Sequence, residues 1–386
     1  MQSNPISLDQ ATGENTMKMV FIAPHKYVQG RGVMAEIGSY AKLLGKKPIL
    51  LWDDVVKGLI GQTVLASIDQ AGLSPIDVPF GGEATRDEAN RVVELARQQG
   101  ADAIIGLGGG KSIDVAKAVS VDAKLRLMTV PTIAATDAPT SAATVWYDAD
   151  SNFIGFECWP FNPDIVLVDT QVIARGPARA FAAGMGDALA TWVEAEASFK
   201  SRATNIAGGV STRAAMAIAR LGYEMLMECG LEALRAVQLG LVTPAVEKIV
   251  EANVLHSGLG FESGGLATAH MIANPLSNFP ECKNLMHGEK VGFGIITQLC
   301  LDEDTDVDEM NQIVDFEIAI GLPVTFADLN LAGVTRDRLQ VIGDACGGEG
   351  SLCHNHCFRV TADDAIDAMF AADALGRERK ALMGMD

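Results

Sequence analysis

The sequence has no uninterrupted apolar run of about 18 residues, the length that a membrane-spanning helix needs, so we expect no transmembrane segment. It is also poor in positive charge: 30 Lys and Arg stand against 49 Asp and Glu, a formal net charge of −19. Because no stretch concentrates basic residues, we expect no binding to nucleic acid or to an anionic membrane surface. The first residues are polar and lack the apolar core of a secretory signal, which favours a cytoplasmic location.

The seven cysteines are an odd number, which fits reduced thiols in a protein that is not exported. Cys353, His354, His356 and Cys357 place four potential metal ligands within five residues. Zinc modules supply their ligands as separated pairs, and the sequence holds no second pair. A short turn before the last helix is therefore the favoured interpretation, with a closed zinc site as the alternative.

What the chain does have is apolar material for a large core, 48% of its residues, and a length that predicts two or three domains. Short apolar runs predict strands at residues 48–52, 103–107, 127–130 and 165–168, with helices at 55–70 and 113–119 between them. Strands that alternate with helices predict a parallel, doubly wound, Rossmann-like sheet, whose ligand lies beyond the carboxyl ends of the strands.

After about residue 175 the pattern becomes helical. We expect helices at residues 181–199, 203–229, 231–239, 243–257, 266–272, 288–301, 307–320 and 362–375. The predicted organisation is a loose extension at 1–16, an α/β nucleotide-binding domain at 17–175 and an all-helical metal-binding domain at 176–386. The cleft between the two domains is the expected place for a site.

Glycine is enriched, at about 10% of the chain against a usual value of about 7%. Gly106 lies near the end of a predicted strand, and Gly108, Gly109 and Gly110 lie between that strand and a predicted helix, followed by Lys111. Such a turn aims backbone N–H groups and the positive end of a helix at an anion, and glycine allows close approach to a pyrophosphate. The segment fits neither the Walker A pattern nor G-x-G-x-x-G, and a plain tight turn is the alternative.

Two further loops follow strand ends. Asp53 ends the first predicted strand, where a carboxylate could bind the ribose of an adenosine and would repel a 2′-phosphate, which favours NAD. The loop at residues 131–141 is rich in hydroxyl groups and holds Asp137 between two prolines. A rigid polar loop in that place suits the wall of a ligand site.

The six histidines are few enough to consider singly. His270 and His287 each lie on or at the start of a predicted helix, and Asp187 lies on the first helix of the second domain, on a polar stripe with Thr191 and Glu194. One carboxylate and two imidazoles leave an open position on a divalent metal, as catalytic sites do. Spacing alone also fits histidines that merely pack in the core.

These segments together resemble the iron-dependent alcohol dehydrogenase superfamily, in particular its zinc-using glycerol dehydrogenase branch, from about residue 17 to about residue 376. The resemblance rests on residues 108–114, 136–139, 186–192, 258–266 and 287–291. It implies the dehydroquinate synthase-like fold of that superfamily and homo-oligomers, often octamers.

The resemblance also implies roles for individual residues. Asp187, His270 and His287 would hold a catalytic Zn²⁺ and meet the substrate, and Asp137 would contact a substrate hydroxyl. The residues that would bind NAD are Asp53, Gly108, Gly109, Gly110, Lys111, Ser112, Asp114, Thr132, Ser141 and Tyr147.

Two departures bear on these roles. Iron-using members have a histidine four residues after the aspartate, where this chain has Thr191, which points to zinc. Glycerol dehydrogenases commonly have a second histidine three residues after the first ligand histidine, where this chain has Ala273. The metal set is therefore intact, while the exact diol is open.

The implied reaction is NAD-dependent oxidation of glycerol and related vicinal diols to dihydroxyacetone and its analogues. A metal lowers the pKa of the alcohol, hydride passes to the nicotinamide, and the protein aligns donor and acceptor. The alternatives are a related alcohol or diol dehydrogenase, a dehydroquinate synthase-like lyase, a glycerol-1-phosphate dehydrogenase, and a relative that binds metal and nucleotide without catalysis. The two enzymes of phosphorylated substrates need basic residues near the triad, and the second half supplies few.

Overall fold

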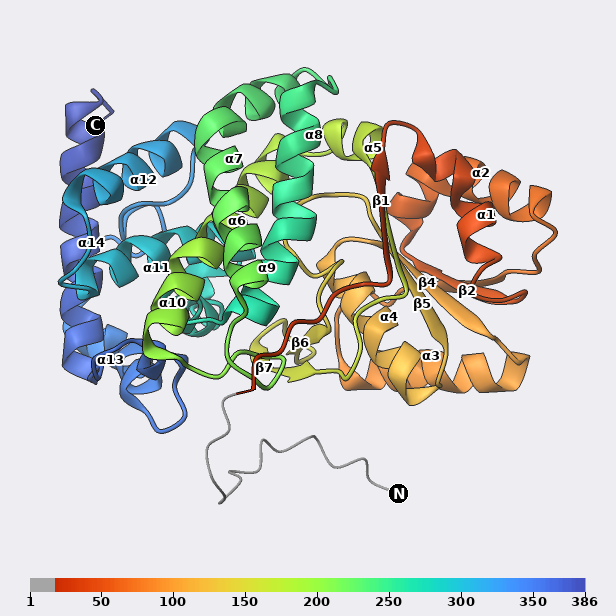
Figure 1. Cartoon of the computed structure of the whole chain (residues 1–386), viewed down its shortest axis with the longest axis horizontal. Coiled ribbons are helices and arrows are strands. Elements are labelled where there is room, and N and C mark those ends of the chain that lie inside the picture. The colour runs from red at the N-terminus through yellow and green to blue at the C-terminus, as the bar shows by residue number, and fades with distance from the viewer. Residues whose placement is uncertain (1–17, 386) are drawn as a thin grey trace.

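The structure, a computed structural model, describes residues 18–385, so the extension expected at residues 1–16 lies outside the described part. A sheet flanked by helices forms one end of the molecule, and a group of helices forms the other (Figure 1). The first described residues run between the two parts before they enter β1 (Figure 1). The expected combination of a parallel sheet with a helical part is confirmed.

The main sheet has six strands in the order β1-β8-β5-β4-β2-β3, and all neighbours are parallel. The strands are β1 (Lys26–Gly30), β2 (Pro48–Trp52), β3 (Ile76–Pro79), β4 (Ala103–Gly108), β5 (Arg126–Pro131) and β8 (Ile165–Asp169). A separate antiparallel hairpin consists of β6 (Ala143–Tyr147) and β7 (Phe153–Cys158). The four predicted strands are confirmed as β2, β4, β5 and β8.

The sequence analysis missed the two edge strands and the hairpin. β3 is a four-residue strand that alternates buried and exposed residues and ends in proline, and β1 is polar and largely half-buried. Neither has the continuous apolar run that identified the central strands, because an edge strand is not buried on both faces to the same extent.

Alternate side chains of each central strand pack on opposite faces of the main sheet. Leu50 and Ile105 lie in one core with α1 (Ile37–Ala41) and α2 (Asp54–Gln70). Ile49 and Ile104 lie in the other with α3 (Arg86–Gln99) and α4 (Gly110–Asp122). With both faces covered, the carboxyl ends of the strands are the part of the sheet left for a ligand.

The second half of the chain is helical, as expected. Its helices are α5 (Thr170–Ala174), α6 (Ala178–Ser201), α7 (Arg213–Gln238), α8 (Pro244–Glu251), α9 (Ser257–Gly264), α10 (Thr268–Leu276), α11 (His287–Leu301), α12 (Val307–Ile320), α13 (Arg336–Gly347) and α14 (Ala362–Leu382). The domain boundary at residue 175, which stays a prediction, falls between α5 and α6.

Three expected helices divide the chain differently from the structure. The helices expected at 203–229 and 231–239 are one helix, α7, which starts ten residues later because Arg202 ends α6 in a left-handed conformation and a turn with Gly208 follows. The helix expected at 243–257 continues through a π-helical segment, Ala252–His256, into α9. α3 and α13 were not predicted.

Gly260 and Gly264 lie inside α9 and serve helix packing. A Cβ atom on Gly260 would lie 2.4 Å from Cγ2 of Thr191 on α6, and one on Gly264 would lie 2.8 Å from Cβ of Ala195. Glycine therefore lets α9 approach α6 closely, whereas Gly265, whose φ is +114°, turns the chain at the end of α9.

Buried hydrogen bonds join the two parts. Asn253 Nδ2, from the π-helical segment, donates to the carbonyl oxygens of Ala134 and Phe181 at 3.0 and 3.2 Å. Glu262 on α9 accepts from the backbone N–H of Ala142 and from Asn162 Nδ2, both at 2.5 Å. The loop after β5 is thus held against the helices.

Within residues 18–385, none of the helices combines the length and the hydrophobicity needed to cross a membrane. All seven cysteines are free thiols, as expected. The segment with Cys353 and Cys357 forms a 3₁₀ turn before α14, with Cys353 buried and Cys357 exposed, which agrees with the favoured interpretation.

Candidate active site

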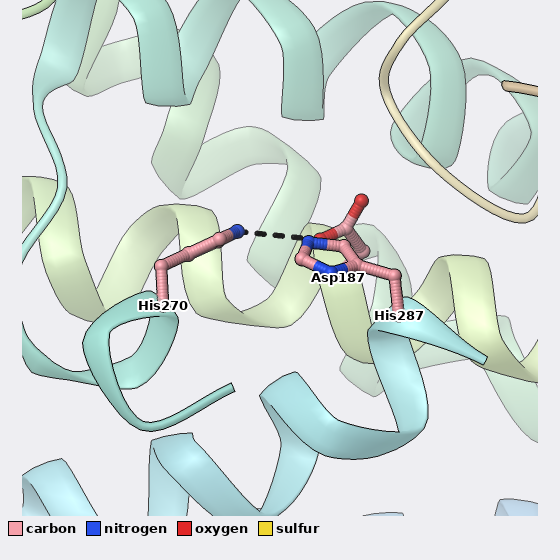
Figure 2. Close-up of side chains that lie close together, drawn as sticks. All are labelled: Asp187, His270 and His287. Carbon is pink, nitrogen blue, oxygen red and sulfur yellow. Dashed lines mark ion pairs between the residues drawn. The ribbon is translucent and has the colours of Figure 1, made fainter. Parts of the chain in front are cut away.

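Three helices bring one carboxylate and two imidazoles together. Figure 2 shows Asp187 from α6 beside His270 from α10 and His287 from α11. Oδ1 of Asp187 lies 3.5 Å from Nε2 of His270 and 3.4 Å from Nε2 of His287. In the described part of the chain this is the one group of three or more His, Cys, Asp or Glu residues placed to hold a metal ion.

Close packing of α6 on α11 creates this convergence. A Cβ atom on Gly288 would lie 1.8 Å from the carbonyl oxygen of Ala183, and one on Gly186 would lie 2.6 Å from the carbonyl oxygen of Gly288. Only glycine permits such an approach, and each glycine is the chain neighbour of a triad residue. The backbone contact therefore sets the separation of Asp187 and His287.

The triad fits a tetrahedral divalent metal. Two ligand atoms that each lie about 2.1 Å from such an ion are about 3.4 Å apart, close to both separations measured from Asp187 Oδ1. That oxygen is buried and has no hydrogen-bond partner in the described structure. A buried carboxylate oxygen without a partner is costly, and a cation would remove that cost.

The charges of the triad are tuned by burial and by one another. Burial lowers the pKa of His287 to about 4, which keeps this imidazole neutral, as a metal ligand must be. Burial acts to lower the pKa of His270 too, but the carboxylates of Glu194 and Asp187 raise it well above its usual value. Burial acts to raise the pKa of Asp187, yet the two imidazoles lower it below the usual range.

Asp137 from the loop after β5 lies against the triad. Its backbone N–H donates to Oδ2 of Asp187 at 3.3 Å, and its Oδ2 accepts from Ser257 Oγ at 2.9 Å. Ser257 is also 3.1 Å from Thr191 Oγ1. Burial and the nearby charge of Asp187 raise the pKa of Asp137 well above its usual value. The structure thus brings together all four residues predicted as catalytic.

The glycine-rich turn lies at the carboxyl edge of the sheet, where the strand order switches between β2 and β4. Gly108 has a φ of +137°, which favours glycine, and Gly109 precedes α4 without any side-chain cap. Asp53 follows the neighbouring strand β2 and caps α2 by accepting from the N–H of Val56 at 2.8 Å. The edge therefore has the geometry of an anion site at a switch point.

The side chain of Lys111 forms an ion pair in the described structure. Its Nζ lies 2.6 Å from Oε2 of Glu83 and 5.0 Å from the centre of the Tyr147 ring. Hydrogen bonds from Lys111 and Ser151 lower the pKa of Glu83 against the upward effect of burial. Lys111 and Tyr147 thus lie together near the start of α4, and their contact with a cofactor stays a prediction.

Four other predicted cofactor residues are buried and interact within the protein. Ser112 Oγ donates to the turn at Gly109 O, 3.0 Å away. Asp114 pairs with Lys117 at 2.8 Å and accepts from Val145 N at 3.0 Å. Ser141 Oγ lies 3.4 Å from the same lysine, and Thr132 N donates to Gly108 O. The side chains of Ser112, Asp114 and Ser141 and the backbone of Thr132 hold the turn and the hairpin in place; direct contact with NAD stays a prediction for all four.

Two residues that support the triad were not given that role by the sequence. Glu194, named only as part of a polar stripe, contacts His270, and Gln298 contacts the start of the helix that bears it. The spacing of seven residues between Asp187 and Glu194 was the available signal, since it places both on one face of α6. Ala273, where a histidine is common, is fully buried in the core of the helical part.

Residues 24–170 match the family described as iron-containing alcohol dehydrogenase. A glycerol dehydrogenase of Pseudomonas putida is 42% identical over 355 residues, which cover 92% of this chain and 97% of that protein. The chain belongs to the iron-containing alcohol dehydrogenase family. It is therefore an NAD-dependent alcohol oxidoreductase of a family that uses a metal.

Two further family relatives sharpen the comparison. A glycolaldehyde reductase of Halobacterium salinarum is also 42% identical, over 94% of this chain and 99% of that one. The crystal structure of glycerol dehydrogenase from Schizosaccharomyces pombe superposes with a TM-score of 0.91 at 35% identity, and covers 96% of this chain and 94% of that one. The family's fold therefore extends over both parts of this chain.

Proposed function

We propose that this protein oxidises glycerol and related vicinal diols with NAD, and converts glycerol to dihydroxyacetone. The observation that carries the proposal is the triad of Asp187, His270 and His287, with an unpartnered oxygen of Asp187 at its centre and Asp137 beside it. The names of the similar glycerol dehydrogenases support the choice of substrate.

Asp187, His270 and His287 would hold one divalent metal, which we propose to be Zn²⁺. When bound there, the metal supplies Lewis acidity that lowers the pKa of a substrate hydroxyl. Zinc is favoured because Thr191, one helical turn after Asp187, has a hydroxyl directed to Ser257 where iron-using members have an imidazole as a fourth ligand. Three protein ligands leave a position for the substrate.

Asp137 would orient the second hydroxyl of the diol. Ser257 donates a hydrogen bond to one oxygen of the Asp137 carboxylate. The backbone N–H of Asp137 donates to Asp187, so the carboxylates of Asp137 and Asp187 keep fixed directions. A fixed acceptor beside the triad favours a substrate with two adjacent hydroxyl groups over a simple alcohol, because the second hydroxyl gains a hydrogen bond.

For the cofactor, the turn at Gly108, Gly109 and Gly110 would receive the pyrophosphate at the start of α4, and Asp53 would meet the adenosine ribose. The uncapped start of α4 supports the first placement, and the position of Asp53 at the neighbouring strand end supports the second. Lys111 would exchange its contact with Glu83 for a cofactor phosphate.

Glycolaldehyde reduction is the second candidate, because a reductase of that substrate is as similar to this chain as the glycerol dehydrogenases are. Ala273 replaces an imidazole common in glycerol dehydrogenases, which allows a different substrate. Both candidates use the same triad and cofactor, so they differ in substrate alone.

The test is NADH formation by zinc-loaded protein with glycerol, propane-1,2-diol and ethylene glycol, and NADH consumption with dihydroxyacetone and glycolaldehyde. Highest kcat/KM for the glycerol and dihydroxyacetone pair supports the proposal. Highest kcat/KM for glycolaldehyde supports the second candidate. Absence of any diol-dependent NADH formation overturns the first.

We also propose a cytoplasmic homo-oligomer, whose size light scattering would measure.

A further inference from the structure

The helix that carries His270 has a start without a cap of its own. The residue before α10 is Ala267, which has no side chain that could accept a hydrogen bond. The first N–H groups of a helix have no partner within the helix, and burial makes each unsatisfied group costly. Ala267, Thr268, Ala269 and His270 are all buried, so their N–H groups need acceptors from elsewhere.

Two buried side chains supply these acceptors, and they come from the two helices that carry the other triad residues. Oε1 of Glu194 on α6 accepts from the N–H groups of Ala267 and His270 at 2.9 and 3.1 Å. Oε1 of Gln298 on α11 accepts from those of Thr268 and Ala269 at 2.8 and 3.0 Å. The start of α10 is therefore tied to both α6 and α11.

Glu194 does more than Gln298, because its second oxygen meets the imidazole. Oε2 lies 2.5 Å from Nδ1 of His270. A carboxylate only accepts hydrogen bonds, so the proton of this contact is on Nδ1. Nε2, which faces Asp187, is then the nitrogen whose lone pair can bind a metal.

We infer that Glu194 is a positioning residue that fixes the tautomer of His270 and thereby makes Nε2 a metal ligand, whereas Gln298 stabilises the same helix without this effect. The inference rests on the proposed metal site. Glu194 is fully buried, and its contacts are with His270 and the start of α10, so it acts through His270.

The variant Glu194→Gln separates the two effects of this residue. Its amide oxygen can still accept from the two backbone N–H groups, but its NH₂ group then faces Nδ1 of His270. An NH₂ group donates, so Nδ1 must accept and the proton moves to Nε2. Helix α10 keeps its hydrogen bonds, while Nε2 of His270 carries the proton and has no lone pair for a metal.

The matched control is Gln298→Met, a change of similar length that removes the acceptor for Thr268 and Ala269. It also removes the donor to the carbonyl oxygen of Val193, and it leaves the imidazole contact intact. Zinc affinity is measured by competition with a chromophoric chelator, and the unfolding midpoint of the metal-free proteins by a denaturant titration. We expect Glu194→Gln to weaken zinc binding about 10- to 100-fold. We expect Gln298→Met to lower the unfolding midpoint and to keep zinc affinity within about threefold of the wild type.

Zinc affinity of Glu194→Gln within about threefold of the wild type overturns the role of Glu194. Equal losses in the two variants also overturn it, since helix capping would then explain both. A wild-type protein that binds no zinc overturns the metal site itself, and the role with it.

A measurement on the unaltered protein covers the case in which Glu194→Gln does not fold. With ¹⁵N-labelled histidine and zinc, the His270 signals should show the proton on Nδ1. A proton on Nε2 in the zinc-loaded protein contradicts the inference.

Discussion

The sheet part and the helical part contribute different kinds of chemical group to the candidate site. At the edge of the sheet the structure offers backbone: a glycine turn with a φ of +137° at Gly108 and the uncapped start of α4. In the helical part it offers side chains, Asp187, His270 and His287, held by other buried side chains. The difference agrees with the ligands proposed for the two parts, since N–H groups suit a phosphate and a divalent metal needs lone pairs.

If the two parts bind their ligands separately, a substitution in one part should leave binding of the other part's ligand unchanged. The variant His270→Ala tests this most strongly. It removes one of three metal ligands, so we expect kcat to fall by more than about 1,000-fold, because a metal supplies several kcal/mol to the reaction. Zinc content should fall with it, while the affinity for NAD, measured by fluorescence titration, should remain.

Full zinc content in His270→Ala would refute the assignment of this ligand. A large loss of NAD affinity in the same variant would break the comparison between the two parts, because a side-chain change in the helical part would then have altered the turn.

The contact between the two parts gives the next largest expected effect. Burial raises the pKa of Glu262 to about 7 from the model-compound value of 4.5, against the hydrogen bonds from Ala142 and Asn162 that lower it. Its raised pKa means that the folded protein holds a proton that the unfolded chain releases. The resulting stability is present in full below pH 4.5 and is lost as the pH rises to about 7, a decrease of about 3 kcal/mol.

The measurement is the free energy of unfolding of wild type and Glu262→Gln between pH 4.5 and 8. We expect the wild type to lose stability over this window and the variant, which cannot titrate at residue 262, to lose about 3 kcal/mol less. Parallel pH profiles would show that Glu262 does not titrate in this range.

The glycine turn itself is tested by Gly108→Ala. The φ of Gly108 disfavours any residue with a Cβ atom, and that atom would lie 2.6 Å from Ser112 Oγ. A strained backbone conformation costs about 1–3 kcal/mol, so we expect NAD affinity to fall about 10- to 100-fold if the turn relaxes to avoid it. Zinc content, measured by elemental analysis, should stay at the wild-type level; a loss of zinc would count against separate roles for the two parts.

The smallest effect should come from Gly264→Ala, a glycine in the helical part. Its Cβ atom would lie 2.8 Å from that of Ala195, so α9 and α6 must separate slightly. We expect a loss of about 1–2 kcal/mol in the free energy of unfolding, typical of mild overpacking, with NAD affinity unchanged. Reduced NAD affinity would show that Gly264 on α9 also supports the cofactor site.

The sequence predicted the elements whose burial leaves a pattern. The central strands β2, β4, β5 and β8 are continuous apolar runs, and the helix at residues 307–320 was predicted with the bounds of α12. The edge strand β3 and the hairpin were missed because their pairing with other strands, and not their own composition, makes them strands.

The candidate site was predicted in the same uneven way. Its ligand set came from several short motifs in a familiar order, and the structure brings Asp137, Asp187, His270 and His287 together. The supporting contacts could not be read from the motifs, because Glu194 and Gln298 are 76 and 30 residues away from the backbone groups that they hold. Such contacts exist only after the helices have packed.

The sequence by itself determined the parallel sheet and the helical second half, because apolar periodicity is a local property. Its short motifs, in the order of the family it resembles, predicted the residues for metal and phosphate. Only the tertiary structure decided which nitrogen of His270 is free, which glycines turn the chain and which bring helices together, and that Ser112, Asp114 and Ser141 are engaged within the protein. Those are properties of contacts between distant segments, and packing alone fixes them.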